Sequence, residues 1–142
     1  MAFIATPYFR DCVARALTSA IGKPWKVGAR GPLAFDCWGL ITWAYSVGGI
    51  ALPDWLYSIS DRPATLFEEG IKESASIDFQ RARDKAPFSI VTLAVKGSVI
   101  HVAIYANDVY YHTMLGLGVV GQPEYVLRQR FQTFTYWYPQ CK

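Results

Sequence analysis

The sequence predicts an α+β fold in which N-terminal helices pack on a central, mostly antiparallel β-sheet. Apolar residues recur at helical spacing in the first third of the chain, whereas segments rich in Val, Ile, Tyr and Thr fill the chain from Phe88 onward. Helices that precede strands in this way are typical of the α+β class. A chain of 142 residues has the length of one domain, so we expect residues 1–142 to form a single domain.

The helical part contains two predicted helices separated by a loop. Thr6 is a favourable N-cap, Pro7 suits a first helical turn, and apolar residues then recur at helical spacing. Residues 23–33 hold two glycines and two prolines and are expected to form a loop. A second helix is predicted from Asp36 to about Val47, where a Gly-Gly pair ends it.

The remaining segments are assigned from composition and periodicity. Residues 50–87 give the weakest signal, and short helices are predicted within residues 65–74 and 79–85. Beyond them, a series of segments carries the β-branched and aromatic residues typical of strands. These segments are residues 89–95, 98–106, 109–113, 118–120 and 131–138.

Composition and charge exclude several classes of protein. Apolar residues make up 52% of the chain and charged residues 18%, which excludes a disordered tail. The net charge of +3 is too small for a dedicated nucleic-acid binder, and Arg128 and Arg130 are expected at a solvated strand edge. No apolar run reaches the ~18 residues of a membrane span. The N-terminal segment meets Arg10 and Asp11 too early for a signal peptide, so we expect a protein made in the cytosol and not exported by its own sequence.

The three cysteines do not form a recognisable disulfide or zinc-binding pattern. Cys12, Cys37 and Cys141 make neither an even framework nor a closely spaced pair, so we expect no metal site and no cofactor. Cys12 lies within the first predicted helix and is expected in the core. No role is predicted for Cys141.

Cys37 is a candidate nucleophile because of its position. It lies in Phe35–Leu40 (FDCWGL), where the loop becomes the second helix. Backbone N–H groups without intrahelical partners and the positive end of the helix dipole favour a thiolate there, and the thiolate is the nucleophilic form. The same N–H groups can stabilise an oxyanion. The alternative is that Cys37 is a small buried apolar residue.

Both histidines of the chain lie in one predicted hairpin. If Asn107 and Asp108 form a two-residue turn, Ala103 pairs with His112, and His101 lies on the same face as a diagonal neighbour, about 7–8 Å away between backbones. One imidazole could then accept the thiol proton while the other fixes its tautomer. The alternative is a pair of structural histidines between two strands.

Together these motifs resemble the NlpC-type cell-wall cysteine peptidases, a papain-like family. The family has an aromatic-Asp-Cys-Ser-Gly-aliphatic run at a helix start, a strand of the form His-Val-Gly-Ile-Tyr and a third polar residue about a dozen positions later. Here FDCWGL, HVAIY (residues 101–105) and His112 follow in that order. The upstream loop PWKVGA places Trp25 where the family usually has a Tyr. The resemblance covers roughly residues 10–120 and implies the papain-like NlpC fold.

The resemblance implies that the chain is an enzyme, a cysteine peptidase. Cys37 would be the nucleophile, His101 the general base and later the general acid, and His112 the third, orienting member of the catalytic set. The thiolate would attack a peptide carbonyl, the imidazole would protonate the leaving amine, and water would hydrolyse the thioester.

The resemblance also implies three substrate-binding residues. Asp36 matches a family position that meets the free amine of the substrate, and a helix cap is the alternative or additional role. Trp25 would donate its indole N–H at the site, and the alternative is a packing aromatic. Trp38 replaces the family's Ser after the Cys, so its bulk is expected to change the substrate cleft.

The Trp in DCWG resembles the peptidases of phage tail tips and gene-transfer particles, including the tail protein K type. This implies a peptidoglycan hydrolase that is made in the host cytoplasm and joins other tail-tip or hub proteins. It would act in the periplasm or cell wall during DNA delivery, on the bond between D-γ-glutamate and diaminopimelate in the stem peptide. Two alternatives stay open: a non-enzymatic tail-tip component that keeps the fold, and a cysteine amidase or acyltransferase with another acyl substrate.

Overall fold

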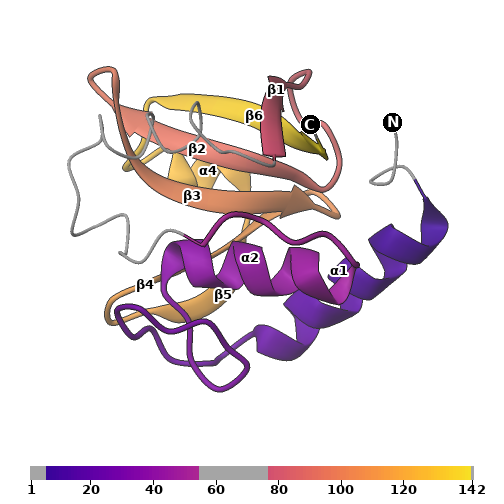
Figure 1. Ribbon diagram of the computed structural model, residues 1–142. Helices are drawn as coiled ribbons and strands as arrows, with labels where there is room; N and C mark the ends of the chain where they lie inside the picture. Colours follow the sequence, from indigo (N-terminus) through magenta and orange to yellow (C-terminus); the bar gives the residue numbers. More distant parts are fainter. Residues whose placement is uncertain (1–5, 55–76, 142) are drawn as a thin grey trace.

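The computed structural model describes residues 6–54 and 77–141 and confirms the α+β class (Figure 1). Within these residues the elements are α1 (Pro7–Ala20), α2 (Cys37–Val47), β1 (Ile77–Arg81), β2 (Ser89–Val95), β3 (Ser98–Ala106), β4 (Val109–Met114), β5 (Gly118–Gln122), α4 (Glu124–Leu127) and β6 (Thr133–Cys141). None of these helices is long and apolar enough to cross a membrane. The helix predicted within residues 65–74 lies outside the described residues.

Local capping interactions begin α1 and α2 where the sequence predicts. Thr6 caps α1 by accepting a first-turn N–H at 3.2 Å. Asp36 caps α2 by accepting the N–H of Gly39 at 2.7 Å, and Gly48 follows the last residue of that helix. Cys12 lies on the buried face of α1, as expected for a core cysteine.

The strands form one sheet in the order β1-β6-β2-β3-β4-β5, with antiparallel neighbours throughout. The prediction of a helix within residues 79–85 is wrong, because residues 79–81 belong to β1 and pair with the end of β6. Pairing with a strand so distant in the chain overrides the weak local preference. Arg128 and Arg130 also differ from the prediction: they follow α4 in the turn before β6 and do not lie on a strand.

The hairpin that carries both histidines has the predicted register. Ala106 pairs with Val109, and the next two pairs of β3 and β4 continue that register. Asn107 and Asp108 form the two-residue turn, with φ values of 54° and 65°. Both residue types tolerate positive φ, and such a turn matches the twist of the flanking strands. The hairpin therefore presents the two histidines on one face.

The sheet buries an apolar cluster on each of its faces. The first cluster packs against α1 and α2 and includes Ile90 and Ile104, whereas the second includes Val91, Tyr105 and Leu127 of α4. Neighbouring residues of β2 and β3 thus point to opposite clusters, as the two-residue period of a strand requires. Figure 1 shows α1 and α2 lying together on one side of the sheet.

Candidate active site

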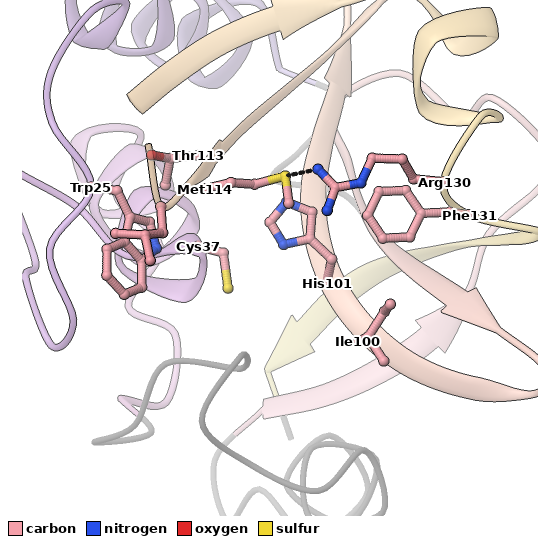
Figure 2. A pocket seen from close by; sticks show the side chains of 9 residues that line it. Trp25, Cys37, Ile100, His101, Thr113, Met114, Arg130 and Phe131 are labelled. Carbon is pink, nitrogen blue, oxygen red and sulfur yellow. Dashed lines mark hydrogen bonds between the residues drawn. The ribbon is translucent and has the colours of Figure 1, made fainter. Parts of the chain in front are cut away.

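One pocket brings together a cysteine and a histidine that are far apart in the sequence (Figure 2). Figure 2 shows Cys37, from the start of α2, and His101, from β3, in this pocket. Its lining consists of Trp25, Cys37, Ile100, His101, Thr113, Met114, Leu115, Arg130 and Phe131. Among the described residues, no three side chains of His, Cys, Asp or Glu gather closely enough to hold a metal ion.

Buried polar contacts place Cys37 at the first position of α2. The carboxylate of Asp36 accepts the N–H of Gly39 at 2.7 Å and that of Gly28 at 2.9 Å, and it pairs with the Arg30 guanidinium at 2.7 Å. These contacts hold the preceding loop against the first turn of the helix. A Cβ at Gly39 would lie 2.0 Å from a carbonyl oxygen of that loop, so this close approach requires glycine. Cys37 is thereby held at the positive end of the helix dipole, which favours a thiolate.

The two imidazoles are in direct contact. Nε2 of His101 lies 3.0 Å from Nδ1 of His112, and the ring centroids are 5.1 Å apart. Phe131 stacks on the His101 ring, with centroids 5.6 Å apart and an interplanar angle of 11°. Both histidines are buried, and only His101 of the two lines the pocket. His101 is therefore held in one orientation by a hydrogen bond and by an aromatic face.

Gln122, the last residue of β5, extends this row of hydrogen bonds. Its Oε1 lies 2.8 Å from Nε2 of His112. An amide oxygen only accepts, so His112 carries its proton on Nε2 and presents a lone pair on Nδ1. His101 then donates from Nε2 to that lone pair, which leaves its own Nδ1 unprotonated. Nδ1 of His101 is thus ready to accept the thiol proton of Cys37.

Burial keeps both imidazoles neutral. Loss of solvation lowers the pKa of His101 well below 6.5, and the nearby His112 and Arg130 lower it further. The pKa of His112 is also lowered, mainly by burial, and the hydrogen bond with Gln122 opposes this shift. A neutral imidazole is the form that accepts a proton, so the resting site holds a general base.

Only one of the three predicted substrate-binding residues lines the pocket. Trp25 lines the pocket, whereas Asp36 and Trp38 do not. The Asp36 side chain is fully buried, and its observed role is that of a helix cap and loop anchor. The indole N–H of Trp38 donates to the carbonyl oxygen of Pro53 at 2.9 Å, so the bulk of Trp38 fills the interior. Substrate contact by these three residues stays a prediction.

Three residues at the site were not predicted from the sequence. Gln122 reaches His112 because β4–β5 pairing places His112 opposite Val120, which makes Gln122 a diagonal neighbour. Extending that hairpin register by two residues would have identified it. Arg130 and Phe131 enter from the turn after α4, and no local pattern predicts the path of that turn.

The model of the NlpC/P60 family matches residues 22–129, a segment that contains Cys37, both histidines and Gln122. A probable endopeptidase of Corynebacterium glutamicum is 49% identical over 43 residues, which cover 30% of this chain and 21% of that protein. The curated relatives are much longer than the shared segment, which spans 11% of one and 21% of another.

Solved structures share the fold over nearly the whole chain. NlpC1 of Trichomonas vaginalis has a TM-score of 0.65 at 23% identity, over 94% of this chain and 45% of that one. The NlpC/p60 domain of the peptidoglycan hydrolase SagA has a TM-score of 0.60 at 21% identity, over 89% of this chain and 96% of that one. RipD of Mycobacterium tuberculosis has a TM-score of 0.56 at 20% identity, over 91% of this chain and 95% of that one. It is described as a non-catalytic NlpC/p60 domain protein adapted to peptidoglycan binding. Since the family model covers most of the chain and the folds agree, this chain belongs to the NlpC/P60 family.

Proposed function

We propose that this chain is a cysteine endopeptidase that hydrolyses peptidoglycan stem peptides. The observation that carries the proposal is the pairing of Cys37 and His101 in one pocket, with His112 and Gln122 setting the tautomer of His101. This arrangement supplies a nucleophile, a general base and an orienting group. The peptidoglycan hydrolase and the probable endopeptidase among the similar proteins support this class of substrate.

In the first half-reaction, the thiol proton of Cys37 passes to Nδ1 of His101 and the thiolate attacks the carbonyl carbon of the peptide bond. The backbone N–H of Cys37, at the start of α2, stabilises the oxyanion that forms. When the C–N bond breaks, the leaving amine takes the proton from Nδ1, and the acyl group remains on the sulfur as a thioester. His112 accepts the Nε2–H of His101 throughout and so keeps the ring in place.

Water completes the cycle. Nδ1 of His101 takes a proton from a water molecule as the water oxygen attacks the thioester carbonyl. The C–S bond then breaks, the sulfur regains a proton, and the acyl product leaves as a carboxylic acid. Proton and bond changes therefore balance with the peptide and one water molecule.

We further propose the bond between D-γ-glutamate and diaminopimelate as the point of cleavage, and a phage-type tail tip as the place of action. The likeness of FDCWGL and HVAIY to the peptidase motifs supports the bond, and the Trp after Cys37 supports the tail tip. The chain would then be made in the host cytoplasm, assemble with tail-tip or hub proteins and reach the wall from the particle. Mass spectrometry of purified particles, and of particles lacking the chain, tests this placement.

Digestion of purified peptidoglycan tests the enzymatic proposal. Wild-type protein and Cys12→Ala should release new muropeptides, whose masses identify the bond, and Cys37→Ala should release none. Cys12 is the matched control because it is a second buried cysteine that does not line the pocket. Circular dichroism and Tm of Cys37→Ala should match the wild type. Wild-type protein as inert as Cys37→Ala on walls that contain the proposed bond contradicts the proposal.

The fold alone does not decide between hydrolysis and binding, since RipD, described as non-catalytic, shares it. If this chain only binds, wild type and Cys37→Ala will both sediment with peptidoglycan and neither will cleave it. If it is an amidase or acyltransferase instead, the mass of the acyl group trapped on Cys37 will differ from that of a muropeptide fragment.

A further inference from the structure

We propose that Arg130 forms a carboxylate-binding subsite in the catalytic pocket, so that the chain selects substrates with a free carboxylate close to the scissile amide. This inference rests on the proposed function and names the chemical class of its substrate. Arg130 lines the same pocket as Cys37 and His101, and Figure 2 shows its guanidinium near the His101 ring. The turn after α4 thus brings a cation to the reacting groups.

The charge of Arg130 has no acidic partner among residues 6–54 and 77–141. Its Nη1 donates to Sδ of Met114 at 3.5 Å, and a thioether is a weak acceptor that does not neutralise a charge. The pocket lining contains no Asp or Glu. Arg128, two positions earlier, has an acidic partner and does not line the pocket. It pairs with Glu124 at 2.9 Å, and its guanidinium lies 4.0 Å from the ring centroid of Phe134. One arginine of this turn therefore serves the fold, and the other faces the pocket.

The surroundings of Arg130 suit a carboxylate. A guanidinium offers a planar fork of donors that matches two carboxylate oxygens. Ile100, Met114 and Phe131 lie in the same pocket lining and offer no charged acceptor that would compete with a carboxylate for its donors. An amide or another neutral group could accept only weaker, uncharged bonds at the same place.

The charge of Arg130 also acts on the catalytic imidazole. It lowers the pKa of His101 and of His112. A cation without a counter-ion therefore disfavours the imidazolium that forms when the thiol of Cys37 loses its proton. A substrate carboxylate on Arg130 removes this penalty, so such substrates gain in the chemical step as well as in binding.

The proposed substrate has carboxylates of this chemistry on both sides of the scissile bond. A γ-linked glutamyl residue keeps its α-carboxylate on the acyl side of the scissile bond, and diaminopimelate carries carboxylates on the leaving side. Three otherwise identical stem peptides separate them: one with all carboxylates free, one with the glutamyl α-carboxylate as carboxamide, and one with the diaminopimelate carboxylates as carboxamides.

Values of kcat and KM for these peptides test the subsite. Wild-type protein should prefer the free acid over one of the two amides by about 10- to 100-fold in kcat/KM. Arg130→Gln should reduce that preference to less than about 3-fold. Arg15→Gln is the matched control, because it removes the same charge from an exposed site on α1 that contributes no residue to the pocket, and it should keep the preference. Added salt should weaken the preference, because Arg130 is exposed.

Binding measurements with Cys37→Ala keep the inference independent of turnover. Calorimetry should show tighter binding of the free acid than of the discriminated amide, and no difference in the Cys37→Ala/Arg130→Gln double variant. Equal binding of all peptides, or a preference that survives the loss of Arg130, overturns the subsite. Equal cleavage of all peptides also overturns it and leaves the proposed function standing. Carboxylate-dependent binding without any cleavage supports the subsite and contradicts the proposed function.

Discussion

Gln122→Leu tests whether the two imidazoles work in only one arrangement of their protons. The substitution removes the acceptor that lies 2.8 Å from Nε2 of His112. His112 can then carry its proton on Nδ1 and donate it toward Nε2 of His101. His101 would in turn hold its proton on Nδ1, where it cannot accept the thiol proton of Cys37. Part of the enzyme population would therefore lack a general base.

The size of the effect follows from the hydrogen bond that is lost. A neutral hydrogen bond contributes about 1–1.5 kcal/mol net, which biases the two tautomers by about 5- to 13-fold. Without that bias the competent tautomer falls from about nine-tenths of the population to about one half, so kcat should fall by about 2-fold in Gln122→Leu. KM should change little because Gln122 does not line the pocket. Gln122→Glu restores an acceptor and should recover kcat. Its carboxylate also raises the pKa of His112, which should move the acidic limb of the kcat profile up by about one pH unit.

The assay is steady-state cleavage of a stem peptide across the pH range for the wild type and both Gln122 variants. Val119→Ala serves as the stability control, since Val119 is a buried residue of β5 outside the row of hydrogen bonds. It should lower Tm and leave kcat and the pH profile unchanged below that temperature. The reasoning is refuted if Gln122→Leu keeps the kcat and pH profile of the wild type.

Three further outcomes concern stability and are measured by urea denaturation. Gly39→Ala should destabilise the fold by about 2–3 kcal/mol, because the new Cβ would lie 2.0 Å from a loop carbonyl oxygen. If the free energy of unfolding rises instead, as it usually does for Gly→Ala within a helix, that close contact is absent. Lowering the pH below 6.5 should reduce the free energy of unfolding, because burial lowers the pKa of His101 and His112 and the unfolded chain binds protons that the folded chain does not. The double variant His101→Gln/His112→Asn should lose most of this pH dependence. If the free energy of unfolding of the double variant depends on pH as in the wild type, the two histidines are not its source. Arg30→Met should lower the free energy of unfolding by about 3 kcal/mol, because the buried carboxylate of Asp36 loses its cation. The double variant Arg30→Met/Asp36→Asn should recover part of that stability. No recovery would mean that the two residues are not energetically coupled.

Much of the candidate site could be predicted because its parts depend on near neighbours. Asp36 caps α2 through Gly39, only three positions away, so the residue types alone placed Cys37 at a helix start. The hairpin turn followed from two residues that tolerate positive φ. The two-residue period of the strands then placed His101 and His112 on one face, and the observed nitrogen–nitrogen distance is 3.0 Å.

Other parts of the site depend on strand partners that lie elsewhere in the chain. Residues 79–81 form a strand because β6 offers them a partner, although their own composition favours a helix. Gln122 reaches His112 only through the register of β4 and β5, and Gly121 beside it is a weak strand former. The indole of Trp38 points into the interior and donates to Pro53, because successive residues of a helix point in different directions and Trp38 does not share the direction of Cys37.

The amino-acid sequence alone determined where α1 and α2 begin and where the histidine hairpin turns, because caps, turns and periodicity act over a few residues. Only the tertiary structure decided that the start of α2, the hairpin and the turn carrying Arg130 meet in one pocket. Which surfaces meet depends on burial and pairing between distant segments, and those free energies are summed over the whole fold.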